Sequence, residues 1–467
     1  STVTIAEDTR GKFEKFPGHD PTQITTPGGA DDPSVGDDTR DFAPFRRLET
    51  QEFVKRTVQS LQFNGEHTLP FFSDGLGWDG VLLFEAPVFD WQYADSRSIR
   101  EEPGTTIIDT KFLSPDNSNP QGVQDIVQFT LAALGPFNTI FRDIEERGDQ
   151  YHLNLELPFE QWSGESGFVR LGIFDDSTSR RFSQDTFALK GENVRVKSTF
   201  DNTRLSGFFE NPDQFTLAIP SFLVSPGGLQ PGPNDFRLDG QQDIEAWYVM
   251  VDLPVTSFLN IIGGARFEST RLTTDLQPDD PDGTTLFIDN QTLDAKGLNP
   301  GLQSLGLLET NDIPINSSID REDVLPSLGF VLTPLEGMKI RGTYSQTLAR
   351  PTFRELTPNT QVLFPGATPF AGNPSLEVSE VENWDIRVDY RPEPGSLLSL
   401  SYFKKTLTNP IQTIQQTQKA TTLIIPVNFP DGTIEGWEFE ARQDMGRFFQ
   451  SLRGLTLGGN LTLLDTE

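Results

Sequence analysis

The stretch Asn383-Trp-Asp-Ile-Arg-Val-Asp-Tyr390 alternates polar and apolar side chains from end to end. Its apolar positions are Trp384, Ile386, Val388 and Tyr390, and its polar positions are Asn383, Asp385, Arg387 and Asp389. Successive side chains of a β-strand point to opposite faces of a sheet. This period of two therefore predicts a strand with one apolar face and one charged face.

The same alternation recurs along the chain, at 151–157, 259–267, 338–344 and 437–442. Several connections between such segments are short and contain Pro or Gly, which is typical of tight turns. The pattern predicts six hairpins, at 57–68/81–94, 150–158/167–175, 243–253/258–273, 324–333/338–346, 381–390/397–407 and 433–443/455–464.

Long polar connections separate these hairpins, at 95–149, 176–242, 274–323, 347–380 and 408–432. Structureless loops above about 15 residues are uncommon in compact soluble domains. Outer-membrane barrels, in contrast, alternate short periplasmic turns with long extracellular loops. We therefore predict an all-β fold, an antiparallel transmembrane β-barrel segment of about 12–14 strands with about 9–11 residues each in the membrane. The apolar face would contact lipid, and the charged face would line an aqueous interior.

Composition narrows the function classes. The 467 residues include 37 Lys and Arg against 68 Asp and Glu, a formal net charge of −31, which argues against nucleic-acid binding. The chain has no Cys, and its three His are widely spaced, so thiolate sites are excluded and a His-based zinc or serine-hydrolase site has little material. Only 35% of the residues are apolar, yet 37 Phe indicate a folded chain.

Two alternatives remain at this point, because alternation looks alike whether the apolar stripe meets lipid or a protein core. One is a secreted all-β protein that acts on or binds carbohydrate, in which Trp384 and Val388 would contact a protein layer. The other is a passive porin-like channel.

A set of motifs follows one another in a fixed order in the second half of the chain. These motifs are Asp323-Val-Leu-Pro-Ser-Leu328, Met338-Lys-Ile-Arg-Gly-Thr-Tyr344, Gly372-Asn-Pro-Ser-Leu376, Glu382-Asn-Trp-Asp385, Leu398-Ser-Leu-Ser-Tyr-Phe-Lys404, Gly436-Trp-Glu438 and Gly454-Leu-Thr-Leu-Gly-Gly-Asn-Leu-Thr462. In order and spacing the set resembles the barrel of TonB-dependent outer-membrane receptors. The resemblance covers 243–467 well and 56–175 more loosely.

The resemblance implies a 22-stranded barrel around an N-terminal plug domain, in the outer membrane of a Gram-negative bacterium. Such receptors import a scarce nutrient of the siderophore, vitamin or oligosaccharide class with energy relayed by the TonB complex. We find no plug-like segment before residue 56 and no closing aromatic-ended strand. We therefore expect a loop-rich N-terminal segment at 1–55, a barrel portion at 56–467, and contact with TonB through a plug domain that this chain lacks.

The resemblance implies no enzymatic activity and no resident cofactor, so we predict no catalytic residues. The implied partners are outer-membrane lipid, lipopolysaccharide and an extracellular small-molecule or oligosaccharide ligand. Ligand contacts are expected in the five long connections, at residues that the sequence does not single out. The acidic surface predicts a neutral or cationic ligand, or lipopolysaccharide bridged by cations.

Two local features suggest individual roles. Asp279, Asp280 and Asp282 gather in one turn, and such a loop could bind calcium, although it lacks the usual spacing and terminal Glu of a calcium loop. A solvated acidic loop is the alternative interpretation. At Arg350-Pro351 we expect Pro351 to end a strand and Arg350 to pair with an acid near the rim.

Overall fold

The computed structural model describes most of the chain. The described residues are 2–16, 45–69, 77–78, 82–113, 124–127, 137–189, 195–197, 216–217, 229–231, 236–278, 316–358, 360–361, 368, 370–418 and 421–467. Nearly all of them lie in antiparallel strands of one 19-stranded sheet, and a second sheet has four strands. The predicted all-β antiparallel fold is confirmed.

Thirteen long strands, counted within the described ranges, form the main sheet. They are β1 (Thr2–Phe16), β2 (Phe45–Thr68), β5 (Val88–Leu113), β7 (Phe137–Gln161), β8 (Ser166–Leu189), β12 (Phe236–Thr256), β13 (Leu259–Pro278), β14 (Ser317–Leu335), β15 (Met338–Ala349), β18 (Ser379–Tyr390), β19 (Leu397–Thr408), β22 (Asp431–Asp444) and β23 (Thr456–Thr466). Each pairs antiparallel with the next. All six predicted hairpins are confirmed by these pairings.

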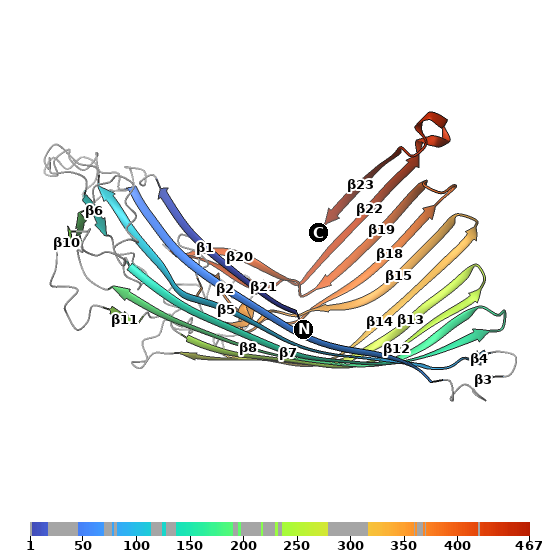
Figure 1. Cartoon of the computed structure of the whole chain (residues 1–467), viewed down its shortest axis with the longest axis horizontal. Helices are drawn as coiled ribbons and strands as arrows, with labels where there is room; N and C mark the ends of the chain where they lie inside the picture. The colour runs from blue at the N-terminus through green and yellow to red at the C-terminus, as the bar shows by residue number, and fades with distance from the viewer. Residues whose placement is uncertain are drawn as a thin grey trace.

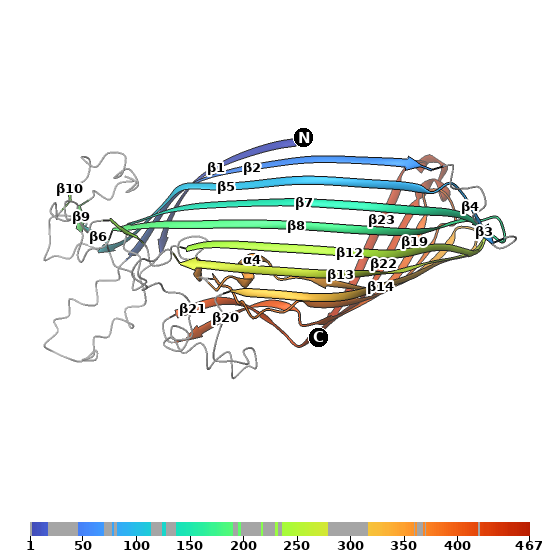
Figure 2. The ribbon, with the colours of Figure 1, turned by 90° about the horizontal axis from the view of Figure 1, so that it is seen from below.

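The meander bends into an open trough, as Figure 1 shows. Viewed from below, in Figure 2, strands β2, β5, β7, β8, β12 and β13 run side by side in chain order. Shorter strands lie in the connections: β3 (Gly77–Trp78), β4 (Leu82–Phe84), β6 (Gln124–Val127), β9 (Arg195–Lys197), β10 (Thr216–Leu217) and β11 (Leu229–Pro231). Two 3-10 turns, η5 (Met445–Arg447) and η6 (Gln450–Leu452), join β22 to β23.

The strands of the first half are much longer than the sequence predicted. Strand β5 has 26 residues and β7 has 25, so much of the expected connection 95–149 is strand. Likewise, the expected loop 176–242 begins inside β8 and ends inside β12. The physical reason is that the regular alternation of apolar with polar residues stops partway along these strands, although the backbone ladder continues.

The N-terminal segment differs from expectation for the same reason. We expected a loop-rich segment over 1–55, whereas the described residues 2–16 and 45–55 lie in β1 and β2. Strand β1 pairs with residues 46–60 of β2, so the boundary expected after residue 55 falls inside a strand.

Two of the later connections fold into a small unit, which we call the inner lobe and define as the described residues of 350–378 and 409–430. It contains α4 (Phe353–Leu356), β16 (Thr360–Gln361), β17 (Phe370–Ala371), β20 (Ile411–Gln418) and β21 (Thr421–Asn428). Strands β16, β17, β21 and β20 form the four-stranded sheet. The lobe lies on the concave side of the trough (Figure 1).

The protein core sits at the lobe, away from the short turns. We call the ends of the strands that lie away from the short turns their upper ends. The largest fully buried side chains come from the upper parts of β12 and β13 and from the lobe: Phe236, Leu272, Leu356, Leu423 and Val427. Among the described residues, no helix is both long and apolar enough to cross a membrane.

Candidate functional site

The apolar face of the sheet is exposed. Residues directly opposite one another in neighbouring strands share a face. One such row runs Leu153, Ile173, Trp247, Phe267, Val324 across five strands. Trp247 is 53% exposed, and Ile386, on the same face of β18, is 46% exposed. No second protein layer covers this face among the described residues, which disfavours the soluble all-β alternative.

Aromatic pairs mark the upper border of this apolar band, where polar residues take over. Trp247 stacks on Phe267 at 4.0 Å between ring centroids, and further pairs follow around the sheet: Tyr93–Tyr151, Tyr344–Trp384 and Tyr402–Trp437. Paired aromatics at this height form the interfacial girdle typical of outer-membrane barrels. From Trp384 to Tyr390 near the short turn, the band measures ~20 Å along the strand.

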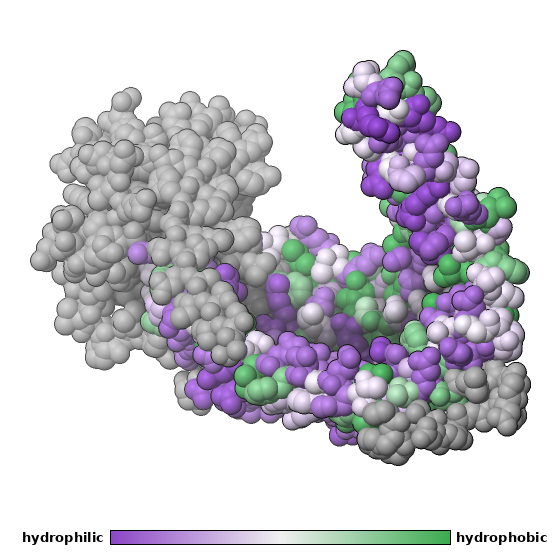
Figure 3. Space-filling model, turned by 45° about the vertical axis from the view of Figure 1, so that its right-hand side comes forward, coloured by the Kyte–Doolittle hydropathy of each residue, from purple (hydrophilic) through white to green (hydrophobic). Residues whose placement is uncertain are grey.

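The opposite, concave face is polar and extensively paired. Toward the short turns, Arg387 bonds Asp389 at 2.9 Å and Glu440 at 3.1 Å, and Arg341 pairs with the same Asp389 at 3.0 Å. In Figure 3, hydrophilic colour dominates the side of the right-hand arm that faces the hollow. Charges placed here can remain paired or hydrated, whereas a dry protein core would penalise each unpaired charge by more than the roughly 2–7 kcal/mol that an unpaired neutral polar group costs.

A second charged cluster lies higher on the concave face and holds the start of the lobe. Arg350, which follows the end of β15 at Ala349, forms an ion pair with Glu268 of β13 and donates to Thr270 Oγ1 at 3.1 Å. Arg266 bonds the same Glu268, which is 5% exposed, at 2.7 Å. The predicted pairing of Arg350 with an acid is confirmed, and it ties the lobe to the wall.

Helix α4 follows directly, because its first turn is well capped. Thr352 accepts a hydrogen bond from the Glu355 backbone amide, and the Glu355 carboxylate accepts one from the Thr352 amide, a reciprocal capping box. The cap directs Phe353 and Leu356 toward Leu272 and Leu376, with which they form a buried cluster.

Helix α4 packs against a glycine of the wall, Gly240 of β12. The ring of Phe353 lies where a side chain on Gly240 would be, since a Cβ there would stand 2.5 Å from Phe353 Cδ1. Asparagines then join the two segments of the lobe: Asn373 Nδ2 donates to the Pro426 carbonyl at 3.2 Å, and Asn428 Nδ2 donates to the Glu377 carbonyl at 3.1 Å. The lobe is thus a packed body docked on the inner wall.

Arginines gather on the concave wall beside the lobe. Arg180 of β8 lies opposite Gly240 in the register and approaches Glu146 to 3.6 Å. Four residues further along the strands, away from the short turns, Glu102 is 2% exposed between Arg100, at 2.5 Å, and Arg142, at 3.2 Å. This region is locally rich in cationic side chains in a chain whose net charge is −31.

A comparison with protein families shows which family this chain belongs to. The family described as "TonB dependent receptor-like, beta-barrel" matches residues 4–467. The chain belongs to the TonB-dependent receptor family. Its barrel wall lies in the outer membrane of Gram-negative bacteria, as the family does.

The solved structures that this chain is similar to have low sequence identity with it. The ferric yersiniabactin uptake receptor FyuA of Yersinia pestis is 10% identical with a TM-score of 0.38, and the match covers 91% of this chain and 52% of that one. The siderophore receptor PirA of Pseudomonas aeruginosa is 12% identical with a TM-score of 0.39, covering 99% and 66%. This receptor chain spans about half to two thirds of the length of these proteins. No curated protein sequence matches it.

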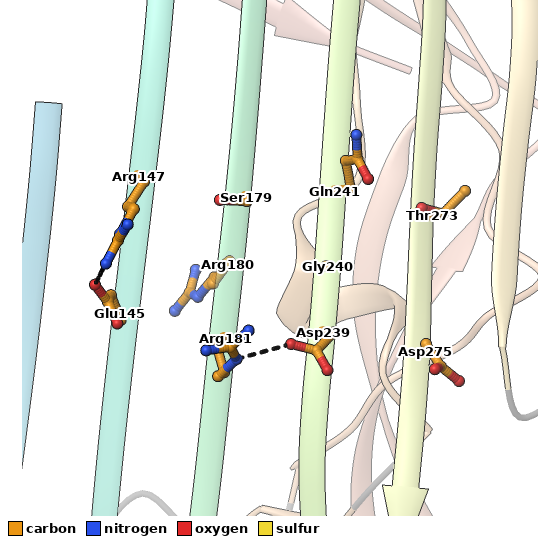
Figure 4. A pocket seen from close by; sticks show the side chains of 10 residues that line it. All are labelled: Glu145, Arg147, Ser179, Arg180, Arg181, Asp239, Gly240, Gln241, Thr273 and Asp275. Carbon is orange, nitrogen blue, oxygen red and sulfur yellow. Dashed lines mark hydrogen bonds and ion pairs between the residues drawn. The ribbon is translucent and has the colours of Figure 1, made fainter. Parts of the chain in front are cut away.

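The outer face of the receptor also carries a depression of about 450 Å³, above the girdle. Figure 4 shows Arg147 beside Glu145 and Arg181 directed to Asp239, on adjacent strands. Hydrogen bonds from Arg147 and then Arg97 hold the pKa of Glu145 below its usual value. Arg180 and Gly240 also border the depression, but the Arg180 side chain pairs with Glu146 on the concave face. The other side chains named here alternate with them along the strands, so the depression opens on the outer face.

The predicted site residues have a mixed outcome in the receptor. Asp279, Asp280 and Asp282 lie outside the described residues, so calcium binding at that turn stays a prediction. Within the described ranges, no group of three or more His, Asp or Glu side chains is placed to hold a metal ion. Of the long connections expected to bind ligand, 347–380 and 408–432 form most of the lobe, and the described ends of the other three are strands.

Sequence reasoning missed Arg142 and Arg180, because both fell inside expected loops. One signal was available: the segments 137–147 and 176–189 contain neither Gly nor Pro, which is unusual for long loops. Sequence reasoning also missed Arg354 of α4, because no local sequence pattern indicated that this residue lies near the wall.

Proposed function

We propose that the receptor is the barrel of an active importer that takes a scarce nutrient, of the siderophore, vitamin or oligosaccharide class, across the outer membrane. The ligand binds on the concave face, between the inner lobe and the long upper strands. The observation that carries this proposal is the two-faced wall. An exposed apolar band bounded by aromatic pairs lies behind a charged and hydrogen-bonded inner surface, onto which the lobe is folded.

Such a wall performs no covalent chemistry. Its inner side chains hold a ligand by charge and hydrogen bonds, and its outer side chains anchor the barrel in lipid and contact lipopolysaccharide above the girdle. Directed movement needs an energy source, so we assign coupling to the TonB complex through a plug domain. A passive channel is disfavoured by the docked lobe, because its buried side chains Leu356 and Leu423 belong to a packed body that narrows the interior.

Uptake in cells tests this proposal. A strain lacking the gene is complemented with the receptor as its gene encodes it, and uptake of labelled ferric siderophores, corrinoids and oligosaccharides is measured with and without a protonophore. We expect receptor-dependent uptake of one ligand class that stops when the proton gradient collapses. Uptake that continues without the gradient would establish a passive channel instead.

A further inference from the structure

The contact between α4 and the wall places two arginines near each other. Phe353 fills the space above Gly240, and Arg180 is the register partner of Gly240 on the same concave face. Arg354 follows Phe353 in the helix, and its charge lies near enough to that of Arg180 for the two to repel each other. The wall and the lobe each contribute one guanidinium to the edge of this contact.

Arg354 makes no contact ion pair with any described residue, although the nearby Glu355 carboxylate attracts its charge. Its guanidinium carbon lies 4.1 Å from the centroid of the Phe370 ring, which holds the side chain in a stacked position. Its Nε is buried and makes no hydrogen bond with any described residue. The neighbouring Glu355 is already engaged by the Thr352 cap. The Nε donor of Arg354 is therefore held in place without an acceptor among the described residues.

Arg180 is only weakly neutralised. Its sole ion pair within the described ranges joins Nη1 to Glu146 at 3.6 Å, beyond hydrogen-bond length, and both side chains are partly exposed. Burial lowers the pKa of Arg354; the neighbouring Glu355 opposes this shift, and the repulsion from Arg180 adds to it by a smaller amount. Two like charges on the two sides of one contact favour a bound anion that can accept hydrogen bonds from both.

We propose that Arg180 and Arg354 form an anion-binding site that joins the barrel wall to the inner lobe. The site takes a carboxylate or phosphate group of the ligand, because the planar guanidinium presents paired N–H donors to such groups. This inference rests on the proposed function and specifies its ligand as anionic. It replaces the expectation of a neutral or cationic ligand, because the net charge of −31 does not describe this part of the concave face.

Citrate titrations test the site. Affinity for citrate is measured by calorimetry on the detergent-purified receptor as its gene encodes it, with maltose and spermidine as neutral and cationic probes. We expect citrate alone to bind, and Arg180→Gln or Arg354→Gln to weaken it about tenfold or more, as the loss of a charge-assisted bond does. Arg181→Gln is the matched control, since Arg181 is the next residue of β8 and faces outward. It should leave the affinity within about twofold.

Hydrogen exchange of the lobe separates binding from structure. Citrate should slow exchange over 353–358 in the unsubstituted receptor and in Arg354→Lys, which keeps the charge, but not in Arg354→Gln. Faster exchange in ligand-free Arg354→Gln would show that Arg354 only supports packing and would overturn the site. Equal citrate affinity in all variants would also overturn it. Either result leaves the proposed importer standing if gradient-dependent uptake persists in cells.

Discussion

The two halves of the sheet cross the same membrane but differ above it. Strands β5 and β7 have 26 and 25 residues, about 80 Å of extended chain, whereas β15 and β18 have 12 each, about 40 Å. In the first half the wall itself continues outward. In the second half the strands end near the girdle, and the chain turns back inside as the lobe. The concave space is thus bounded by a wall from one half and a packed body from the other.

This difference separates two kinds of constraint. Lipid imposes one rule on both halves, an apolar outer stripe, and that rule is visible in the local sequence. Above the membrane no lipid contacts the strands, so an apolar outer stripe is no longer required. The same backbone ladder can carry polar residues there or, as at Phe236 and Leu272, side chains buried against protein. Contacts between distant segments then decide the form.

The largest expected effect tests whether both halves obey the same lipid rule. We expect Val388→Arg in β18 and Leu171→Arg in β8 to destabilise the barrel equally, by about 2–4 kcal/mol, because each places a charge in the apolar band. Urea unfolding in lipid vesicles measures it. Thr343→Arg is the control: Thr343 lies on the concave face opposite Asp385 and should be tolerated. A comparable loss in Thr343→Arg would contradict the assignment of the faces.

The next largest effect is expected at the ion pair between Arg350 and Glu268, which holds the lobe on the wall. Arg350→Ala should destabilise the lobe by about 2 kcal/mol, because Glu268 and Thr270 lose a charged donor, while Arg266 retains part of the compensation. We expect faster hydrogen exchange over 353–358 and unchanged exchange in the membrane part of β18. Slower unfolding of the lobe, or no change, would show that packing alone holds it.

A smaller effect is expected at Gly240, against which Phe353 of α4 packs. Gly240→Ala places a methyl group against the Phe353 ring, at a Cβ distance of 2.5 Å, and should cost about 1 kcal/mol of lobe docking. Protease sensitivity of the lobe measures it. Gly459→Ala is the matched control, since a Cβ there meets nothing within 4 Å. Equal sensitivity of the two variants would mean that Phe353 does not pack as tightly as its position indicates.

The smallest effect concerns the outer surface of the long strands. Arg181 and Asp239 are separated by 3.1 Å and are 74% and 50% exposed, so Arg181→Gln should change the unfolding free energy by about 0–1 kcal/mol. The same urea titration measures it, and raised salt should reduce the difference further. A loss of unfolding free energy above this range would mean that the Arg181–Asp239 pair stabilises the upper parts of the long strands more than its exposure suggests.

Particular residues show how far sequence reasoning reached. The alternation of Trp384, Ile386 and Val388 with Asp385 and Arg387 was sufficient to identify the strand, its two faces and, with its repeats, the six hairpins. It failed at 95–149 and 176–242, because apolar residues there no longer alternate regularly with polar ones and the period of two in hydropathy vanishes. The sequence predicted that Arg350 pairs with an acidic residue, but it could not predict that this residue is Glu268.

The amino-acid sequence by itself determined which residues meet lipid, because contact with acyl chains acts on each strand separately and leaves a local record. Only the tertiary structure decided where the long strands end, how the lobe docks on Gly240, and that Arg180 and Arg354 come together from segments far apart in the chain. Those features arise from packing and charge between distant residues, and such energies depend on a juxtaposition that no single segment encodes.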